Sequence, residues 1–213
     1  MYVTGNTVID ALMKTVRPDY RFDDEDLRSI DFAKRRIILL TTHRRENLGE
    51  PMRHIYKALR SIVGETEDAE IVFPVHRNPL VRQVVNEELA GADRIHLIEP
   101  LDYEPFANLM SRSYLVLTDG GIQEEAPSLG KPVLVLRNTT ERPEAVKAGT
   151  VALIGTDKDA VYNTTKTLLT DADAYNAMSN AVNPYGDGRA AERIVRAILH
   201  VFAGKGGRPD EFM

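Results

Sequence analysis

Short apolar runs alternate with longer amphipathic stretches along most of this chain. The run 36–41 carries four consecutive apolar residues, from Ile37 to Leu40, and this continuity is typical of a strand that is buried on both faces. Runs of the same character occur at 71–75, 95–98, 114–118, 133–136 and 151–154. Strands that alternate with helices predict a Rossmann-like α/β fold, in which helices cover both faces of a parallel sheet.

The stretches between these runs have the spacing of helices with one buried face. After Pro51, apolar residues recur at intervals of three and four, which is the helical period. They are Met52, Ile55, Tyr56, Leu59, Ile62 and Val63. Asn78 and Pro79 predict the cap and first turn of another helix, Asp102 is a further candidate cap, and Thr156 or Asp157 can cap a later helix. The last helix has one apolar face, with Ala190, Ile194, Val195, Ile198 and Phe202.

The chain divides into a central domain with two different ends. Residues 1–35 combine a helix-like stretch near 7–13 with a charged, proline-containing segment, so they are interpreted as a linker and entry helix. Residues 36–204 hold all the predicted strands and form the main domain. Residues 205–213 are predicted to be a C-terminal tail.

Composition narrows the possible partners. The 213 residues carry a net charge of −5, and binding to nucleic acid would need a basic face that displaces counterions. The longest apolar runs fall far short of the roughly 20 residues of a membrane span, and no signal peptide is apparent. The absence of cysteine fits a reducing cytoplasm. We therefore expect a cytoplasmic protein that binds neither nucleic acid nor membrane. The five histidines lack the spacing of a metal site, so we predict no metal and no cofactor.

Four polar loops follow predicted strands, at the edge where parallel sheets bind their ligands. The first, HRREN at 43–47, holds His43, Arg44 and Arg45. Guanidinium groups fit phosphate oxygens in pairs, and an imidazole can donate to a phosphate or transfer a proton. The alternative is a solvated basic turn in which Glu46 pairs with one arginine.

Two further loops repeat this chemistry. VHRNP at 75–79 places His76 at the same edge if both strands lie in one sheet, and the alternative for His76 is a structural role. RNTTERPE at 137–144 holds Arg142 before a proline. Arg142 can reach a phosphate or a sugar, or it can pair with a neighbouring glutamate.

The loop TDGGIQEE at 118–125 contains a pair of glycines between a strand and a predicted helix. Gly120 and Gly121 allow close approach of the backbone, and free N–H groups at a helix start favour an anion. Glu124 and Glu125 follow in the first turns. They either complement the helix dipole, or one of them accepts hydrogen bonds from the hydroxyls of a ribose.

Together these loops resemble the bacterial non-hydrolysing UDP-N-acetylglucosamine 2-epimerase family, in its C-terminal half. The stretches that carry the resemblance are VTGNTVIDAL at 3–12, THRRENLGEP at 42–51, PVHRNP at 74–79, GGIQEEAPSLGKPVLVLRNTTERPEAVKAGT at 120–150 and NPYGDG at 183–188. The resemblance implies one half of a two-domain, glycosyltransferase-B-like fold, with the N-terminal domain absent from this chain.

The resemblance also implies that UDP lies mostly against this half. His43 is then the active-site histidine near the diphosphate, and Phe106 lies by the uracil. Gly120 and Gly121 offer backbone N–H groups to the phosphates, and Glu125 holds the ribose.

Three more residues gain a role in the same way. Arg142 is expected to contact the nucleotide-sugar. Arg44 and His76 match residues that contact a second UDP-N-acetylglucosamine, which acts as an activator. The family is commonly homodimeric and serves cell-wall polysaccharide synthesis.

The family's reaction inverts C2 of the sugar through elimination and re-addition of UDP, with 2-acetamidoglucal as the intermediate. Its carbon acid and base are carboxylates of the N-terminal half, so this chain alone is expected to be inactive. The family pattern also has a serine between the positions of Asp119 and Gly120, and this sequence lacks it. Two other function classes remain open: a non-catalytic nucleotide-sugar-binding module and a glycosyltransferase of the same fold.

Overall fold

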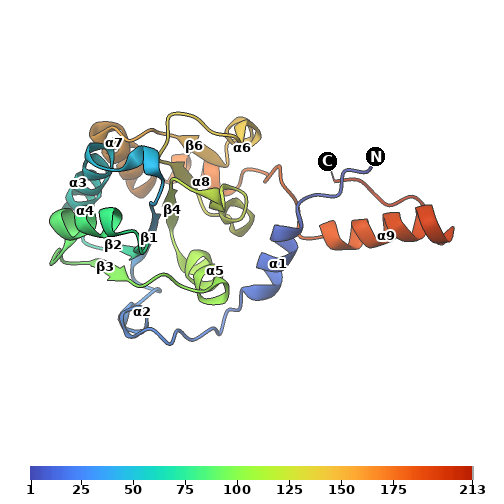
Figure 1. Ribbon diagram of the computed structural model, residues 1–213, viewed down its shortest axis with the longest axis horizontal. Helices are drawn as coiled ribbons and strands as arrows, with labels where there is room; N and C mark the ends of the chain where they lie inside the picture. The colour runs from blue at the N-terminus through green and yellow to red at the C-terminus, as the bar shows by residue number, and fades with distance from the viewer. Residues whose placement is uncertain (213) are drawn as a thin grey trace.

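A computed structural model describes residues 1–212 and contains one six-stranded parallel sheet (Figure 1). The strand order is β3-β2-β1-β4-β5-β6, and each neighbouring pair is parallel. The strands are β1 (Arg36–Thr41), β2 (Ala69–Pro74), β3 (Ile95–Ile98), β4 (Leu115–Thr118), β5 (Val133–Val135) and β6 (Val151–Leu153). The predicted fold class is confirmed, and the predicted strands match within two residues at each end.

The strand order reverses between β1 and β4. From β1 the chain builds β2 and β3 on one side, and it then returns to place β4 on the other side of β1. The connections that leave the carboxyl ends of β1 and β4 therefore run in opposite directions and open a crevice between them. Ligands of doubly wound sheets bind at such a reversal.

Helices cover both faces of this sheet. On one face lie α3 (Glu50–Glu65), α4 (Pro79–Leu89), α7 (Lys158–Thr170) and α8 (Ala172–Ser179). On the other lie α1 (Thr7–Thr15), α2 (Glu25–Ser29), α5 (Tyr103–Arg112) and α6 (Pro143–Ala148). Alternate residues of β1 serve the two cores: Ile38 and Leu40 belong to the first, and Ile37 and Leu39 to the second. This alternation explains why the strand is apolar throughout.

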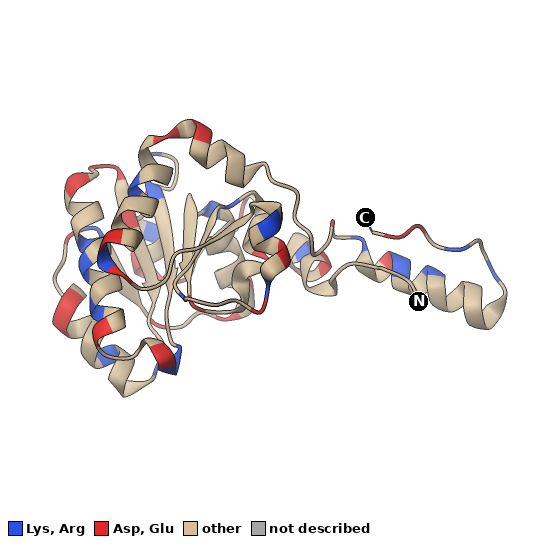
Figure 2. Ribbon diagram, turned by 90° about the horizontal axis from the view of Figure 1, so that it is seen from above, with Lys and Arg blue, Asp and Glu red and all other residues tan. Residues whose placement is uncertain are grey.

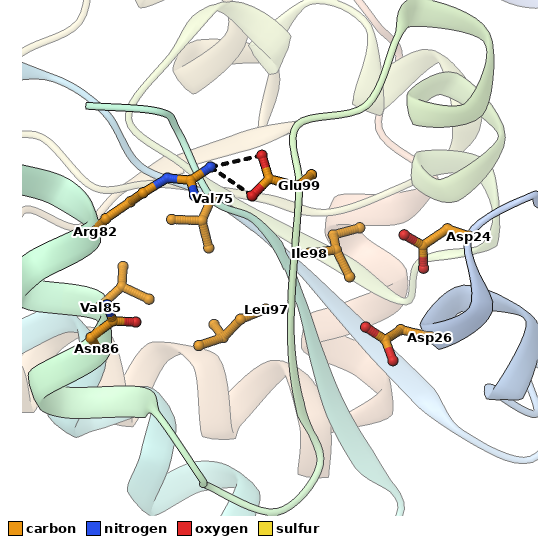
Figure 3. Close-up of a pocket in the computed structure, with 9 residues that line it drawn as sticks. All are labelled: Asp24, Asp26, Val75, Arg82, Val85, Asn86, Leu97, Ile98 and Glu99. Carbon is orange, nitrogen blue, oxygen red and sulfur yellow. Dashed lines mark hydrogen bonds and ion pairs between the residues drawn. The ribbon is translucent and has the colours of Figure 1, made fainter. Parts of the chain in front are cut away.

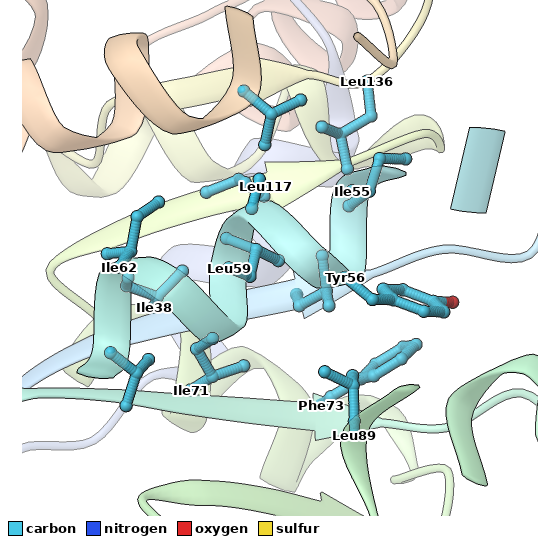
Figure 4. Packing of buried hydrophobic residues seen from close by; sticks show 14 of the residues in the cluster. Ile38, Ile55, Tyr56, Leu59, Ile62, Ile71, Phe73, Leu89, Leu117 and Leu136 are labelled. Carbon is cyan, nitrogen blue, oxygen red and sulfur yellow. The ribbon is translucent and has the colours of Figure 1, made fainter. Parts of the chain in front are cut away.

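The helix α3 packs its predicted apolar stripe across the sheet (Figure 4). All six predicted residues of that stripe are buried. The ring of Tyr56 lies 5.8 Å from that of Phe73, and its hydroxyl shares a hydrogen bond of 2.7 Å with Thr42 Oγ1. The buried tyrosine is therefore satisfied through a residue at the carboxyl end of β1.

Two predicted caps are confirmed. The side chain of Asn78 accepts a hydrogen bond from Leu80 N at the start of α4, and Asp157 accepts from Asp159 N at the start of α7. Asp102 precedes α5 without a side-chain cap.

The segment interpreted as a linker packs closely on the sheet. Leu12, Phe22 and Leu27 are buried in the second core. The fully buried side chain of Asn108 accepts from Arg17 N at 2.8 Å and donates to Thr15 O at 3.2 Å. Residues 1–35 are thus fastened to α5, while the predicted domain boundaries stay predictions.

One prediction for the chain after β4 is wrong. The pair Gly120-Gly121 opens no α-helix, but only two single turns of 3-10 helix, η2 (Gly121–Gln123) and η3 (Ala126–Leu129). Pro127 has no N–H, and its ring would clash with the carbonyl four residues back, so an α-helix cannot continue from η2 into η3.

The last helix, α9 (Ala190–Ala203), extends away from the sheet domain (Figures 1 and 2). Its start is capped by Asp10 of α1, whose carboxylate accepts from Ala190 N at 3.0 Å and from Ala191 N at 2.8 Å. The apolar face predicted from the sequence is exposed: Ile198 is 52% accessible and Phe202 84%. Only Ala190 of this helix is buried. No helix within residues 1–212 has the length and apolarity needed to cross a bilayer.

The first core generates a stability prediction. Phe73→Ala should lower the free energy of unfolding by about 3–5 kcal/mol, because it opens a cavity beneath Tyr56 in a fully buried site. Urea unfolding would measure the loss. Leu80→Ala, at a residue that is 56% exposed, is the control and should change the value by less than about 0.5 kcal/mol. Equal effects of the two substitutions would contradict this packing.

Candidate functional site

A cavity of about 220 Å³ lies at the reversal of the strand order. Its walls come from the carboxyl ends of β1, β2 and β4 and from α5. Five residues that the sequence singled out line it: His43, His76, Phe106, Gly120 and Gly121. The structure therefore brings together side chains and backbone from four separate parts of the chain.

The buried carboxylate of Asp119 holds the two loops at this reversal together. Asp119 follows β4 and is completely inaccessible to solvent. It accepts hydrogen bonds from His43 N at 3.1 Å, from Arg44 N at 2.9 Å and from Asn47 Nδ2 at 3.1 Å. A buried carboxylate needs several donors to offset its lost hydration, and the loop after β1 provides them.

The imidazole of His43 is held from three directions. Its Nδ1 lies 3.5 Å from Asp119 Oδ1, and its ring stacks on that of His76 with centroids 5.3 Å apart. A Cβ atom at Gly120 would lie only 3.2 Å from His43 Cε1, so the absence of a side chain at Gly120 allows this close approach. The side chain of His43 remains 46% exposed and is accessible to a ligand.

The two glycines differ in what their amides can offer. The N–H of Gly120 donates to Thr118 Oγ1 at 2.8 Å, and that hydroxyl also bonds with Thr41 Oγ1 at 2.8 Å. In this conformation the N–H of Gly120 is therefore already used within the loop. Gly121 N makes no such loop or side-chain hydrogen bond within residues 1–212, so it is the glycine amide available to a ligand.

Glu125 lies beside α5, next to the cavity rather than among its lining residues. Tyr103 donates its hydroxyl to Glu125 Oε1 at 3.3 Å. Burial raises the pKa of the Glu125 carboxyl above its usual range, the Tyr103 hydrogen bond opposes this, and the nearby Glu124 adds to it. Glu125 thus contacts α5, the helix that also carries Phe106.

Arg142 and Arg44 also lie outside the cavity lining. Arg142 forms an ion pair with Glu124 at the end of η2. Arg44 donates from Nε to Asp119 O at 2.9 Å and lies 3.5 Å from Glu141, so it extends from the loop toward the connection after β5. The three predicted residues that do not line the cavity are therefore Arg44, Glu125 and Arg142, and each contacts a neighbouring loop or helix instead.

Sequence reasoning missed the two acidic residues that organise the site. It did not single out Asp119, and for Glu124 it offered only a helix-dipole role or contact with a ribose, not the pairing with Arg142 and Asn6. The signal for Asp119 was available, since an acidic residue that directly follows an apolar strand must be buried with partners or exposed at the edge. The signal for Glu124 was absent, because its partners are distant in sequence.

A larger cavity, of about 380 Å³, lies at the β3 edge (Figure 3). Asp24, Asp26 and Glu99 line it with a single cation, Arg82, which Glu99 already binds through both oxygens at 2.8 and 2.7 Å. Its acidic lining disfavours an anionic ligand. Residues 1–212 hold no cluster of three or more His, Asp or Glu side chains that could bind a metal ion.

The strand order and the cavity at its reversal put this chain in the class of doubly wound α/β proteins that bind ligands at the carboxyl edge. A family model described as UDP-N-acetylglucosamine 2-epimerase matches residues 1–199. The chain therefore belongs to the UDP-N-acetylglucosamine 2-epimerase family.

Individual relatives agree with this membership. The UDP-N-acetylglucosamine 2-epimerase of Bacillus subtilis is 54% identical over 213 residues, which cover 100% of this chain and 55% of the relative. The enzyme of the same name from Escherichia coli is 52% identical over 207 residues, covering 93% and 54%. This chain thus spans about half the length of the curated relatives it matches.

Solved structures show the same relation. Staphylococcus aureus MnaA, solved with UDP, superposes with a TM-score of 0.90 at 49% identity, over 100% of this chain and 57% of that one. The Neisseria meningitidis UDP-GlcNAc 2-epimerase bound to UDP-GlcNAc gives a TM-score of 0.79 at 43% identity, over 92% and 54%. The predicted half of a two-domain, glycosyltransferase-B-like fold is confirmed by this coverage.

The environment of Glu125 generates a pH prediction. Because the pKa of Glu125 is raised in the folded protein, its carboxyl holds a proton more tightly there than in the unfolded chain. The stability that this proton contributes is complete below the unfolded pKa and is lost as the pH rises through the folded pKa. Glu125→Gln keeps the acceptor for Tyr103 without the charge, so it should raise the melting temperature at pH 7. The gain should vanish below pH 4.5, the usual pKa of a glutamate.

Calorimetry between about pH 4 and about pH 8, a range that brackets this titration, would measure the difference in melting temperature between Glu125→Gln and the parent chain. Glu141→Gln is the control, since the carboxyl of Glu141 has its pKa lowered by backbone hydrogen bonding and by Arg137. This substitution should destabilise the protein at pH 7. A Glu125→Gln variant that is less stable than the parent at pH 7 would contradict the raised pKa.

Proposed function

We propose that this chain is the UDP-binding half of a UDP-N-acetylglucosamine 2-epimerase, which interconverts UDP-GlcNAc and UDP-ManNAc. The observation that carries the proposal is the cavity at the β1–β4 reversal, where His43, His76 and Gly121 meet Phe106. It combines donors for an anion with an apolar surface for a base. The relatives that this chain matches over about half their length are named for this activity.

The nucleoside is proposed to lie along α5. The ring of Phe106 offers an apolar surface to the uracil, and aromatic faces stack well on bases. Glu125, when ionised, is an acceptor-only group that can take hydrogen bonds from both ribose hydroxyls. Tyr103, which now donates to Glu125, would have to share this carboxylate with the ribose.

The diphosphate is proposed to lie at the reversal itself. His43 would donate to it from the imidazole, and Gly121 would supply a backbone N–H. The guanidinium of Arg142 adds positive charge from the neighbouring loop. Donors fixed in advance stabilise a departing diphosphate without reorganisation when its charge develops, and this is the main chemical task of this half.

The proposed reaction needs no net oxidation. A base removes the C2 proton while the C1–O bond to UDP breaks, which gives 2-acetamidoglucal and UDP. UDP then adds back at C1 as a proton returns to the opposite face of C2. His43 and Arg142 serve the leaving group, and the carboxylates that move the carbon proton are proposed to belong to an N-terminal half.

The exposed face of α9 supports the proposal that a second, N-terminal half packs against this chain. Val195, Ile198, Leu199 and Phe202 are each at least 43% accessible, on a helix that extends beyond the sheet domain (Figure 1). A contiguous apolar face of this kind marks an interaction surface. We propose that the N-terminal half of the same protein covers it.

Three finer features complete the proposal. Arg44 and His76 would contact a second UDP-GlcNAc that acts as an activator. Because His76 is stacked on His43, a change in the position of His76 on activator binding would affect His43. The protein would work as a homodimer in the cytoplasm, where an absence of cysteine fits the reducing conditions. Its product would enter cell-wall polysaccharide synthesis.

Other functions are separated by their products. A glycosyltransferase of this fold needs an acceptor and does not exchange the C2 proton with deuterated water. A hydrolysing epimerase releases free N-acetylmannosamine. A non-catalytic binding module gives neither product.

We expect His43→Ala and Arg142→Ala each to lower turnover at least about a hundredfold in a two-domain protein that contains this chain. Loss of a fixed donor to the leaving diphosphate is the reason. Proton NMR would follow the conversion of UDP-GlcNAc to UDP-ManNAc. His54→Ala, at an exposed histidine of α3, is the matched control and should leave the rate unchanged.

Unchanged rates would remove His43 or Arg142 from the mechanism. The chain of 213 residues alone should bind UDP without turnover. Turnover by this chain alone would refute the assignment of the carbon acid and base to another half.

The surface of α9 generates a separate prediction. Phe202→Ala should lower the free energy of unfolding of a two-domain protein by about 3 kcal/mol, since a buried phenylalanine is removed there. In the isolated chain, where Phe202 is 84% exposed, the loss should stay below about 0.5 kcal/mol. Denaturant unfolding of both proteins measures this, with Arg196→Ala on the same helix as the control. Equal losses in the two proteins would exclude Phe202 from the interface.

A further inference from the structure

Glu124 is a nearly buried carboxylate at which three distant segments meet. Its side chain is 12% exposed. One carboxylate oxygen accepts a hydrogen bond from Arg142 Nε, and the other accepts from Asn6 Nδ2. Its backbone carbonyl accepts from Asn183 Nδ2 at 2.9 Å. These partners are separated from Glu124 by 18, 118 and 59 positions in the sequence.

Two of these partners belong to the junction between α1 and α9. Asn6 N donates to Tyr185 O at 2.7 Å, and a Cβ atom at Gly5 would lie 3.3 Å from the Cα of Gly186. The backbones of the two segments are therefore in direct contact where the chain enters and leaves the sheet domain. Glu124 ties this junction to the loop that carries Arg142.

The way Glu124 binds Arg142 leaves the useful part of the guanidinium open. The carboxylate takes Nε, and the two terminal nitrogens make no hydrogen bond within residues 1–212. The Arg142 backbone is fixed as well, since Arg142 N donates to Thr140 Oγ1 at 3.0 Å, and that hydroxyl donates to Gln123 Oε1 at 3.0 Å. A guanidinium held by Nε presents its remaining fork to a planar or tetrahedral anion.

We propose that Glu124 is a positioning residue that sets Arg142 for the diphosphate and links its placement to the α1–α9 junction. This proposal rests on the proposed function, because it takes the diphosphate as the ligand of Arg142. Glu124 itself contacts no ligand. Movement of the junction would shift the Glu124 carboxylate and, with it, Arg142. The position of a domain packed on α9 would therefore affect the binding of the phosphates.

Binding measurements on the 213-residue chain test the first part. Glu124→Gln keeps the shape of the side chain and removes its charge, which should weaken UDP about five- to tenfold, the scale for losing a charge-assisted hydrogen bond. Uridine lacks phosphates and should bind unchanged in an NMR titration. Glu141→Gln, which removes an exposed carboxylate of the same loop, is the matched control and should change UDP binding less than about twofold.

A double-mutant cycle separates positioning from a general structural effect. In an Arg142→Lys background, which has no Nε to hold, Glu124→Gln should change UDP binding less than about twofold. Effects that multiply, or an equal loss of uridine binding, would overturn the proposal. If the parent chain fails to bind UDP, the proposed function fails as well. If the parent binds and the cycle shows no coupling, only this inference fails.

The Arg142 Nε–H resonance tests the link to the junction without any ligand. Asn6→Ser keeps a capping oxygen at the start of α1 and removes the amide that donates to Glu124. The Nε–H signal, assigned by its loss in Arg142→Lys, should shift in Asn6→Ser with little change in melting temperature. This readout also stands if Glu124→Gln does not fold. An unshifted signal in Asn6→Ser would disprove the coupling.

Discussion

The carboxylate of Asp119 is the constraint on which the rest of the site depends. It is completely buried, and all its donors come from the loop after β1, on the other side of the strand-order reversal. Because a buried charge without donors would be severely destabilising, the loops after β1 and β4 are fixed relative to each other whenever the domain is folded. The stacking of His43 on His76 and the close approach to Gly120 follow from this attachment.

The site therefore has two layers with different physical tasks. The cavity is lined by His43 and Gly121, which carry hydrogen-bond donors, and by the apolar ring of Phe106. Outside it, Asp119 and Glu124 are carboxylates that bind cationic or N–H groups of the loops. An acidic residue is unfavourable next to a bound anion unless its charge is already matched, and each of these carboxylates accepts hydrogen bonds from at least two donors.

The sequence predicts the sheet and its buried strands well, because continuous apolarity and helical spacing are local properties. It also predicts that His43 and His76 reach one cavity, since the carboxyl ends of parallel strands share one edge, but not that Arg44, Glu125 and Arg142 lie outside its lining. It fails after Gly120-Gly121, where Pro127 limits the chain to single 3-10 turns. It gives no hint of Glu124 as a meeting point, because Asn6 and Arg142 come together only in three dimensions. The apolar face of α9 was found, but not that the folded domain leaves it uncovered.

The junction between Asp119 and Gly120 lies just beyond the last paired residue of β4, Thr118. Side chains of a strand alternate between two faces, so the loss of one residue inside β4 would send its apolar side chains into the opposite core. A residue lost after Thr118 leaves every strand pair where it was. Changes of length at this position would move the backbone amides that follow Asp119 and leave the packing of the sheet unchanged, so the carboxyl edge of this domain can vary independently of its interior.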